Sequence, residues 1–191
     1  VIGGRAAVSA VRYDFGVARM SMEGKLDDAF GRRGIVTTNV TGAGSADLQA
    51  LALQPDGKIV AAGNATLANG DLSFAVVRYL PDGTLDSGFG RNGTSLTDFA
   101  GKLEEVTSLG VQADGKIVLV GRAAGNGGAD VVVLRYKADG APDDAFHGNG
   151  RVQLDFDDLH ESGNMVGFQG REIIVQVSSE KPALVRLKED G

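Results

Sequence analysis

Residues 54–63 read Q-P-D-G-K-I-V-A-A-G, and residues 112–121 read Q-A-D-G-K-I-V-L-V-G. A weaker copy, F-Q-G-R-E-I-I-V-Q-V, occupies 168–177. In the two strong copies an Asp-Gly pair, which favours a two-residue hairpin, stands directly before an apolar segment with the composition of a strand. The Asp-Gly pair moves from position 56 to position 114, a step of 58 residues. The block therefore predicts a strand–turn–strand unit that recurs along the chain.

A second block follows each strong copy of the first. It reads V-V-R-Y-L-P-D-G-T-L-D-S-G-F-G at 76–90 and V-L-R-Y-K-A-D-G-A-P-D-D-A-F-H at 133–147. A related stretch, V-A-R-M-S-M-E-G-K-L-D-D-A-F-G, occupies 17–31, and a shortened one, V-R-L-K-E-D-G, occupies 185–191. Two blocks in a fixed order at a constant period indicate a tandem structural repeat.

Each repeat is expected to form four strands. In the repeat at 48–99 they are predicted at Leu48–Gln54, Lys58–Ala62, Phe74–Tyr79 and Thr94–Phe99. In the next repeat they are predicted at Glu105–Val111, Lys116–Val120, Val131–Tyr136 and Arg151–Phe156. Four-stranded meanders at a constant period are typical of β-propeller blades. A β-sandwich could use the same number of strands, but it gives no reason for the turn chemistry to recur.

The sequence therefore predicts an all-β propeller built from four-stranded antiparallel blades of about 58 residues. Its 191 residues correspond to roughly 3.3 such blades. The expected parts are the end of one blade (1–41), two blades (48–99 and 105–156) and the start of a further blade (164–191). Because closed propellers need roughly 4–8 blades, we expect that further blades of a longer chain, or other chains, complete the ring.

The pattern D-G-K-I-V-x-x-G, then F-x-x-x-R-Y, then D-G-x-L-D-x-x-F-G resembles the delta-60 repeat, a propeller-type repeat of bacteria. The resemblance covers nearly the whole chain, although Gln169–Gly170 replaces the Asp-Gly pair in the last copy and Arg171 replaces its lysine. It implies an extracytoplasmic bacterial protein (secreted, periplasmic or at the cell surface) with tandem blades, and it implies no defined activity.

Composition excludes several classes of function. The chain has 19 Lys and Arg against 25 Asp and Glu, a net charge of −6, and no basic stripe of the kind that binds a phosphate backbone. No apolar run approaches the ~20 residues that span a bilayer. The lack of cysteine excludes disulfides, thiolate metal sites and a cysteine nucleophile. We therefore expect neither a nucleic-acid partner nor membrane insertion.

Residues that recur in every repeat are predicted to serve the blade architecture. The arginines are expected to bind turn carbonyls or the aspartate eight residues later, and the phenylalanines to fill space between neighbouring blades. The arginines are Arg19, Arg78, Arg135 and Arg186, the aspartates Asp27, Asp86 and Asp143, and the phenylalanines Phe30, Phe89 and Phe146.

The loops that differ between repeats are the predicted location of any binding site. In a meander the uniform Asp-Gly turns lie at one end of each sheet, and the connections 64–71, 100–104, 122–130 and 157–164 lie at the other. Variable loops on a rigid scaffold are where sites are usually built. The candidate binding residues there are Asn69, Asp71, Asn126, Asp130, Asp157, His160 and Glu161.

The densest group of reactive side chains is D-F-D-D-L-H-E at 155–161. Oxygen ligands with one imidazole could hold a divalent cation, and paired carboxylates could act as general acid and base. A solvated strand end also explains the stretch, with Asp155 and Asp157 on one face and Phe156 on the other. His147 stands where positions 31 and 90 have glycine. The stretch 121–128, G-R-A-A-G-N-G-G, lacks the G-K-[ST] ending of a phosphate loop and is expected to be a surface loop.

Two functions remain open from the sequence. The first is a non-enzymatic extracytoplasmic scaffold or binding module for protein or glycan, with no cofactor and no bound metal. The second is a hydrolase or lyase with an acidic, metal-assisted site on the face of the variable loops.

Overall fold

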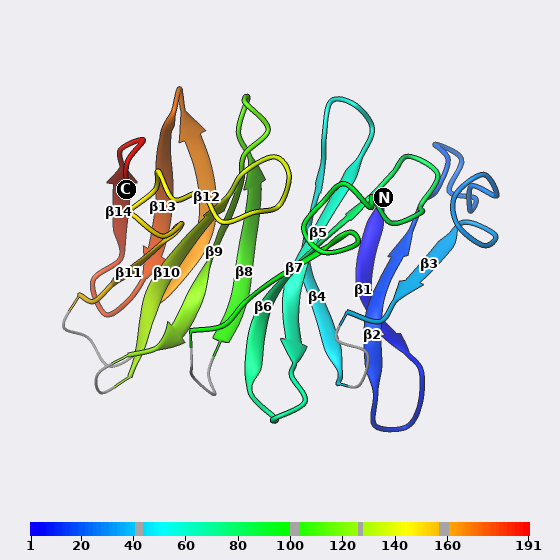
Figure 1. The fold of residues 1–191 in the computed structure, drawn as a ribbon, viewed down its shortest axis with the longest axis horizontal. Coiled ribbons are helices and arrows are strands. Elements are labelled where there is room, and N and C mark those ends of the chain that lie inside the picture. Colours follow the sequence, from blue (N-terminus) through cyan, green and yellow to red (C-terminus); the bar gives the residue numbers. More distant parts are fainter. Residues whose placement is uncertain (41–43, 100–103, 126–127, 157–160) are drawn as a thin grey trace. The chain divides into compact units, whose positions relative to one another are not determined.

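The computed structural model describes residues 1–40, 44–99, 104–125, 128–156 and 161–191. In these ranges the fold is all-β, with fourteen strands and no helix (Figure 1). No helix long and apolar enough to cross a bilayer occurs among these residues. The chain divides into two compact units, Val1–Thr97 and Asp98–Gly191, and each contains one three-stranded and one four-stranded antiparallel sheet.

The first unit holds the sheets β1–β2–β3 and β4–β5–β6–β7. Their strands are β1 (Ile2–Ala7), β2 (Tyr13–Ala18), β3 (Ile35–Thr38), β4 (Ala46–Leu53), β5 (Ile59–Thr66), β6 (Leu72–Tyr79) and β7 (Thr94–Thr97). Neighbouring strands in each sheet are consecutive in the chain, so both sheets are meanders.

The second unit has the same organisation, with the sheets β8–β9–β10–β11 and β12–β13–β14. Their strands are β8 (Glu104–Val111), β9 (Ile117–Ala124), β10 (Ala129–Tyr136), β11 (Arg151–Leu154), β12 (Ser162–Gln169), β13 (Glu172–Ser178) and β14 (Ala183–Leu187). The all-β propeller fold predicted from the period of the repeat is thus confirmed: the repeated unit is a four-stranded antiparallel blade.

The strand boundaries differ from the sequence prediction. The first strand begins up to two residues earlier, at Ala46 in β4 and Glu104 in β8, and the third begins two residues earlier, at Leu72 in β6 and Ala129 in β10. The second strand of each blade continues beyond the prediction, as β5 does to Thr66, because the hairpin to the third strand keeps pairing. The fourth strand is shorter than predicted, ending at Thr97 in β7 and at Leu154 in β11. In the second unit the chain leaves the sheet early because the N–H of Phe156 donates to the Glu161 side chain.

A β-bulge in the first strand of each blade explains the last glycine of the first block. The register shifts between Leu48 and Ala50 in β4 and between Val106 and Ser108 in β8. Gly121 lies opposite Val106, and a Cβ atom at Gly121 would overlap the carbonyl oxygen of Glu105. In these two blades the bulge brings the backbone of the first strand so close to Gly63 and Gly121 that neither has room for a Cβ atom.

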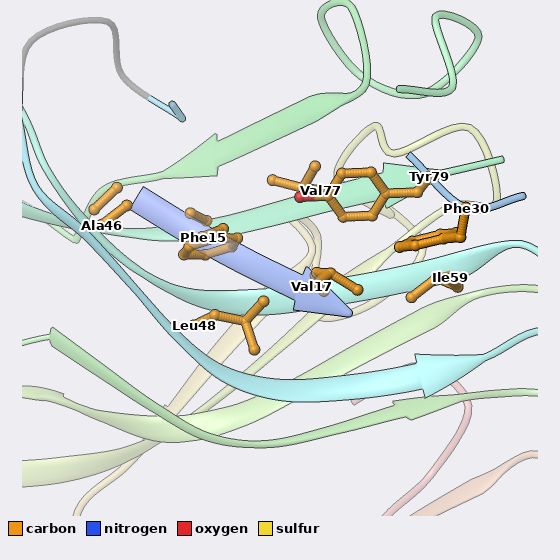
Figure 2. Close-up of a cluster of buried hydrophobic side chains, with 11 residues drawn as sticks. Phe15, Val17, Phe30, Ala46, Leu48, Ile59, Val77 and Tyr79 are labelled. Carbon is orange, nitrogen blue, oxygen red and sulfur yellow. The ribbon is translucent and has the colours of Figure 1, made fainter. Parts of the chain in front are cut away.

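The two sheets of the first unit pack face to face around one apolar cluster (Figure 2). Phe15 and Val17 of β2 meet side chains of the β4–β7 sheet, including Ile59 and Val77. The Tyr79 hydroxyl donates to Thr38 Oγ1 at 2.7 Å across the two sheets, and burial raises the pKa of Tyr79 to about 12. The second unit has a corresponding cluster, which joins valines of β9 and β10 to Ile173, Val175 and Val177 of β13.

Candidate functional site

The recurring arginine, aspartate and phenylalanine form one structural unit in three blades. Arginine Nε lies 2.8, 2.9 and 2.7 Å from the aspartate Oδ2 in the pairs Arg19–Asp27, Arg78–Asp86 and Arg135–Asp143. Each guanidinium also stacks on a phenylalanine ring, at 5.0 Å from Phe30 and 4.6 Å from Phe89 and Phe146. The two side chains can meet across eight residues because the aspartate N–H donates to the arginine carbonyl and so folds the intervening turn back on the strand.

These three ion pairs differ in exposure. The arginine side chain is 26% exposed in Arg19, 8% in Arg78 and 1% in Arg135. Arg186 departs from the pattern: it is largely exposed in β14, and its ion-pair partner is Glu172 at 3.7 Å. Phe30 and Phe146 are fully buried between the two sheets of their units. Phe30 belongs to the apolar cluster that contains Ile59, and Phe146 belongs to the cluster that contains Ile173.

The lysine of the first block is a second cation on the same carboxylate. Lys58 Nζ lies 3.3 Å from Asp86, and Lys116 Nζ lies 3.2 Å from Asp143. Burial alone would raise the pKa of Asp143, but the hydrogen bonds and charges of Lys116 and Arg135 outweigh it and hold that pKa below its usual value. The constant lysine in D-G-K-I-V was the sequence signal for this contact, and sequence reasoning missed it.

His147 has a structural role through its backbone. Its φ is +49°, close to the +56° of Gly31 and the +52° of Gly90 at the equivalent positions. Its N–H donates to the carbonyl of Asp190 at 2.6 Å, as the N–H of Gly31 donates to Asp82 at 2.7 Å. Histidine thus takes a left-handed conformation that glycine adopts without strain, and it keeps the contact between neighbouring sheets.

Among the described residues, the structure brings two of the variable-loop candidates from separate predicted loops together, Asp130 and Glu161. Asn69 and Asp71 lie in the hairpin between β5 and β6, where Asn69 Nδ2 donates to Asp71 Oδ2 at 2.7 Å. Asn126, Asp157 and His160 lie outside the residues that the structure describes. The loop expected at 122–130 is shorter, because β9 continues to Ala124 and β10 begins at Ala129; Asp130 is therefore a buried strand residue that accepts from Gln153 Nε2 at 2.8 Å.

Glu161 was expected in a solvated loop, and the structure corrects this. Its side chain is 1% exposed, and Oε1 accepts the Phe156 N–H at 2.7 Å. Glu104, at the start of β8, is equally buried and accepts the Phe99 N–H at 2.6 Å. Each glutamate binds the backbone five residues before it, at the start of a new blade. Because the same contact recurs in two blades, we assign it a structural role.

Two members of the predicted acidic group, Asp155 and Glu161, converge with Asp130, which the sequence placed in a separate loop. Asp130, Asp155 and Glu161 each place a carboxylate oxygen within 4.8 Å of the other two. Oxygen atoms at this spacing could hold a divalent cation or share a proton. Asp155 is exposed, whereas Asp130 and Glu161 are buried, so any ion would reach the cluster from the side of Asp155.

A pocket of about 300 Å³ opens at the opposite end of the sheets in the second unit. It lies between the β8–β9 turn (112–116) and the β12–β13 turn at Gly170 and Arg171, and Arg135 and Glu189 complete its lining. Sequence reasoning missed this pocket because it treated the Asp-Gly turns as uniform and therefore without function.

Four-stranded meanders with shared turn chemistry define the repeated unit as a β-propeller blade. Residues 54–89 and 112–146 match the family model described as "Domain of unknown function (DUF5122) beta-propeller". The matched segments run from the Asp-Gly turn of the first block to the phenylalanine of the second. A search of curated proteins found no match to the chain. The match supports a repeat-type β-propeller, and the delta-60 name stays a prediction.

Proposed function

We propose that the chain is part of a non-enzymatic, extracytoplasmic bacterial β-propeller that serves as a scaffold or binding module for protein or glycan. The observation that carries the proposal is that the two ends of each sheet differ in how much they vary between blades. Constant residues at one end are engaged in blade architecture, and the hairpins at the other end differ from blade to blade.

The turns at the constant end have the same hydrogen bonds in different blades. Gln54 and Gln112 each donate their N–H to the lysine carbonyl four residues later at 2.8 Å. The hairpins at the other end differ from each other: Leu67 N–H donates to Asp71 O, four residues later, at 2.8 Å, whereas Gly125 N–H donates to Gly128 O, three residues later, at 2.9 Å. A rigid frame with unlike hairpins is the arrangement on which recognition surfaces are commonly built.

Further blades or other chains would complete the ring. The sheets β1–β2–β3 and β12–β13–β14 each have three strands where the repeat has four. Their edge strands expose Ile2 and Leu184, and open edges with apolar side chains readily pair with further strands.

The proposal predicts that binding depends on the variable hairpins. Replacing 67–71 by a two-residue Asn-Gly turn should abolish retention on the glycans or proteins that the unaltered chain binds in an array of purified polysaccharides and cell-envelope proteins. Asp56→Asn, at the constant end of the same sheet, is the control, since Asn-Gly also favours this turn. Unchanged retention by the hairpin variant, or equal loss in the control, would contradict the proposal.

The second candidate, a hydrolase or lyase with a metal-assisted acidic site, is favoured by the convergence of Asp130, Asp155 and Glu161. Under the binding-module proposal, elemental analysis of the purified chain should find no stoichiometric divalent cation, and polysaccharide cleavage should be absent. One bound cation per chain that Asp155→Asn and Glu161→Gln remove, and that Glu104→Gln leaves in place, would establish the alternative. Glu104→Gln is the matched control because it removes the same kind of buried glutamate–backbone contact.

A further inference from the structure

The pocket at the constant end of the second unit contains buried polar atoms with unused hydrogen-bonding capacity. Arg135 lines it and is 1% exposed. Its Nε is engaged by Asp143, but Nη1 and Nη2 have no hydrogen-bond partner among the residues that the structure describes. In the first unit the corresponding Arg19 uses Nη1 to donate to the carbonyl of Pro81 in the neighbouring sheet. Arg135 thus keeps the bond to the aspartate of its own blade and lacks, in the described ranges, the bond to a carbonyl of the neighbouring blade.

The orphaned nitrogens are held in a fixed direction. Asp143 fixes the Nε side of the guanidinium, and the Phe146 ring lies against its face at 4.6 Å. A buried cation with unsatisfied donors is costly, and a planar guanidinium matches a carboxylate through two parallel hydrogen bonds. The geometry therefore favours an acceptor with two oxygens.

The same pocket offers an unused acceptor. Gln112 is 8% exposed, and its Nε2 donates to the carbonyl of Arg171 at 3.2 Å. This bond assigns the amide, so that Oε1 is the remaining atom, and Oε1 is buried with no hydrogen-bond partner in the described part of the chain. A ligand that satisfies the pocket needs a donor group next to its acceptor pair.

The charged residues of the wall are already paired. Lys116 lies 3.2 Å from Asp143 and 3.7 Å from Asp114, and Arg171 lies 2.8 Å from Glu189. These pairs do not favour a highly charged anion such as a polyphosphate. The atoms without a partner among the described residues, Nη1 and Nη2 of Arg135 and Oε1 of Gln112, therefore decide what the pocket selects.

We propose that this pocket binds a hydroxy carboxylate, with the carboxylate on Nη1 and Nη2 of Arg135 and a neighbouring hydroxyl donating to Gln112 Oε1. The volume of about 300 Å³ is at the lower limit of small-ligand sites, which suits a single sugar acid or a short hydroxy acid. The inference goes beyond the proposed function, because the pocket lies at the opposite end of the sheets from the variable hairpins.

The test is a titration of the ¹⁵N-labelled chain, observed by NMR at the Arg135 Nε–H and the Gln112 side-chain amide. D-Glucuronate and lactate should saturate and shift both signals, whereas D-glucose, which lacks the carboxylate, should not. Propanoate, which lacks the hydroxyl, should bind about threefold to tenfold more weakly than lactate, as expected for one lost hydrogen bond. Glucuronate binding without lactate binding would assign a sugar acid, and the reverse a short hydroxy acid.

Two variants of one exposed residue separate binding from folding. Ala113 lines the pocket in the β8–β9 turn, so Ala113→Glu places a negative charge at its mouth, and Ala113→Gln is the neutral control of the same size. Ala113→Glu should weaken lactate binding at least about tenfold and Ala113→Gln by no more than about threefold. Lack of saturation by glucuronate and lactate up to ~50 mM, or equal binding by the two variants, would overturn the proposal. Because neither variant alters a variable hairpin, these outcomes are independent of the array experiment.

Discussion

Asp143→Asn is expected to lower the free energy of unfolding by about 2 kcal/mol at neutral pH, measured by urea denaturation. The substitution removes the charge that balances Arg135 and Lys116, which lie 2.7 and 3.2 Å from Asp143 Oδ2. Arg135 is too buried to regain water, so the loss leaves an uncompensated cation. The effect should fall below that of full removal of the side chain, because the asparagine oxygen still accepts a hydrogen bond.

Asp27→Asn is the matched control, because Asp27 holds the equivalent Arg19 in an ion pair that is exposed to solvent. Water screens such a pair, so we expect an unfolding midpoint close to that of the unaltered chain. Equal midpoints for Asp143→Asn and Asp27→Asn would show that burial does not decide the strength of the repeated ion pair.

Acidification provides a second measurement on the same variants. The pKa of Asp143 is lower in the folded chain than in the unfolded one, so its contribution to stability is complete above the unfolded value of about 3.9. The contribution is lost as the pH falls through the lower folded value. Asp143→Asn should therefore lose less stability below about pH 4 than the unaltered chain, although Asp86, whose pKa is also lowered, keeps part of the dependence.

The repeated ion pair shows what a repeat makes predictable. Arg135 and Asp143 are eight residues apart on a strand and the turn that follows it, so their pairing is a local event that the spacing indicates. The strands were predictable for the same reason, since each first block combines a turn signal with an apolar run. Recurrence then indicated that these residues serve the blade.

Contacts between neighbouring blades could not be predicted in this way. The bond from Gln112 to Arg171 joins residues 59 positions apart, and the sequence of neither turn indicates which residue it contacts. Within the ranges that the structure describes, the unpartnered nitrogens of Arg135 are the absence of one such contact, which Arg19 makes to the carbonyl of Pro81. The sequence of Arg135 and its neighbours repeats that of the other blades, and only coordinates show which of its donors is unsatisfied.

The variable ends were predicted least well because polar residues were interpreted as loops. Asp130 and Glu161 have the composition of exposed connections, yet both are buried where one element meets the next. Their burial is possible because each carboxylate has a donor, Gln153 Nε2 for Asp130 and the Phe156 N–H for Glu161. Tertiary pairing decided their environment, and local composition carried no sign of it.

The glycine that ends the first block leads to the other large prediction. In β8 and β9 the residue pair Val106 and Gly121 places the glycine on the second strand, whereas in β12 and β13 the equivalent pair is Gly163 and Val177. One member of the pair is glycine in both sheets. The two glycines have different neighbours: a Cβ atom at Gly121 would overlap the carbonyl oxygen of Glu105, whereas a Cβ atom at Gly163 would overlap the Val120 side chain of the neighbouring sheet.

Gly121→Ala should lower the free energy of unfolding by about 3 kcal/mol in urea denaturation, because the new Cβ overlaps backbone that the bulge holds in place. A flexible side chain could move aside, but the overlapping atom is the carbonyl oxygen of Glu105, whose displacement disturbs the β8–β9 pairing. Gly4→Ala is the control: it alters the equivalent repeat position in β1, where nothing lies within 4 Å of the added carbon. We expect it to leave the unfolding midpoint unchanged or to raise it slightly, because alanine restricts the unfolded chain. Equal midpoints for the two variants would mean that the glycine records the ancestry of the repeat and not the close approach of the bulged strand.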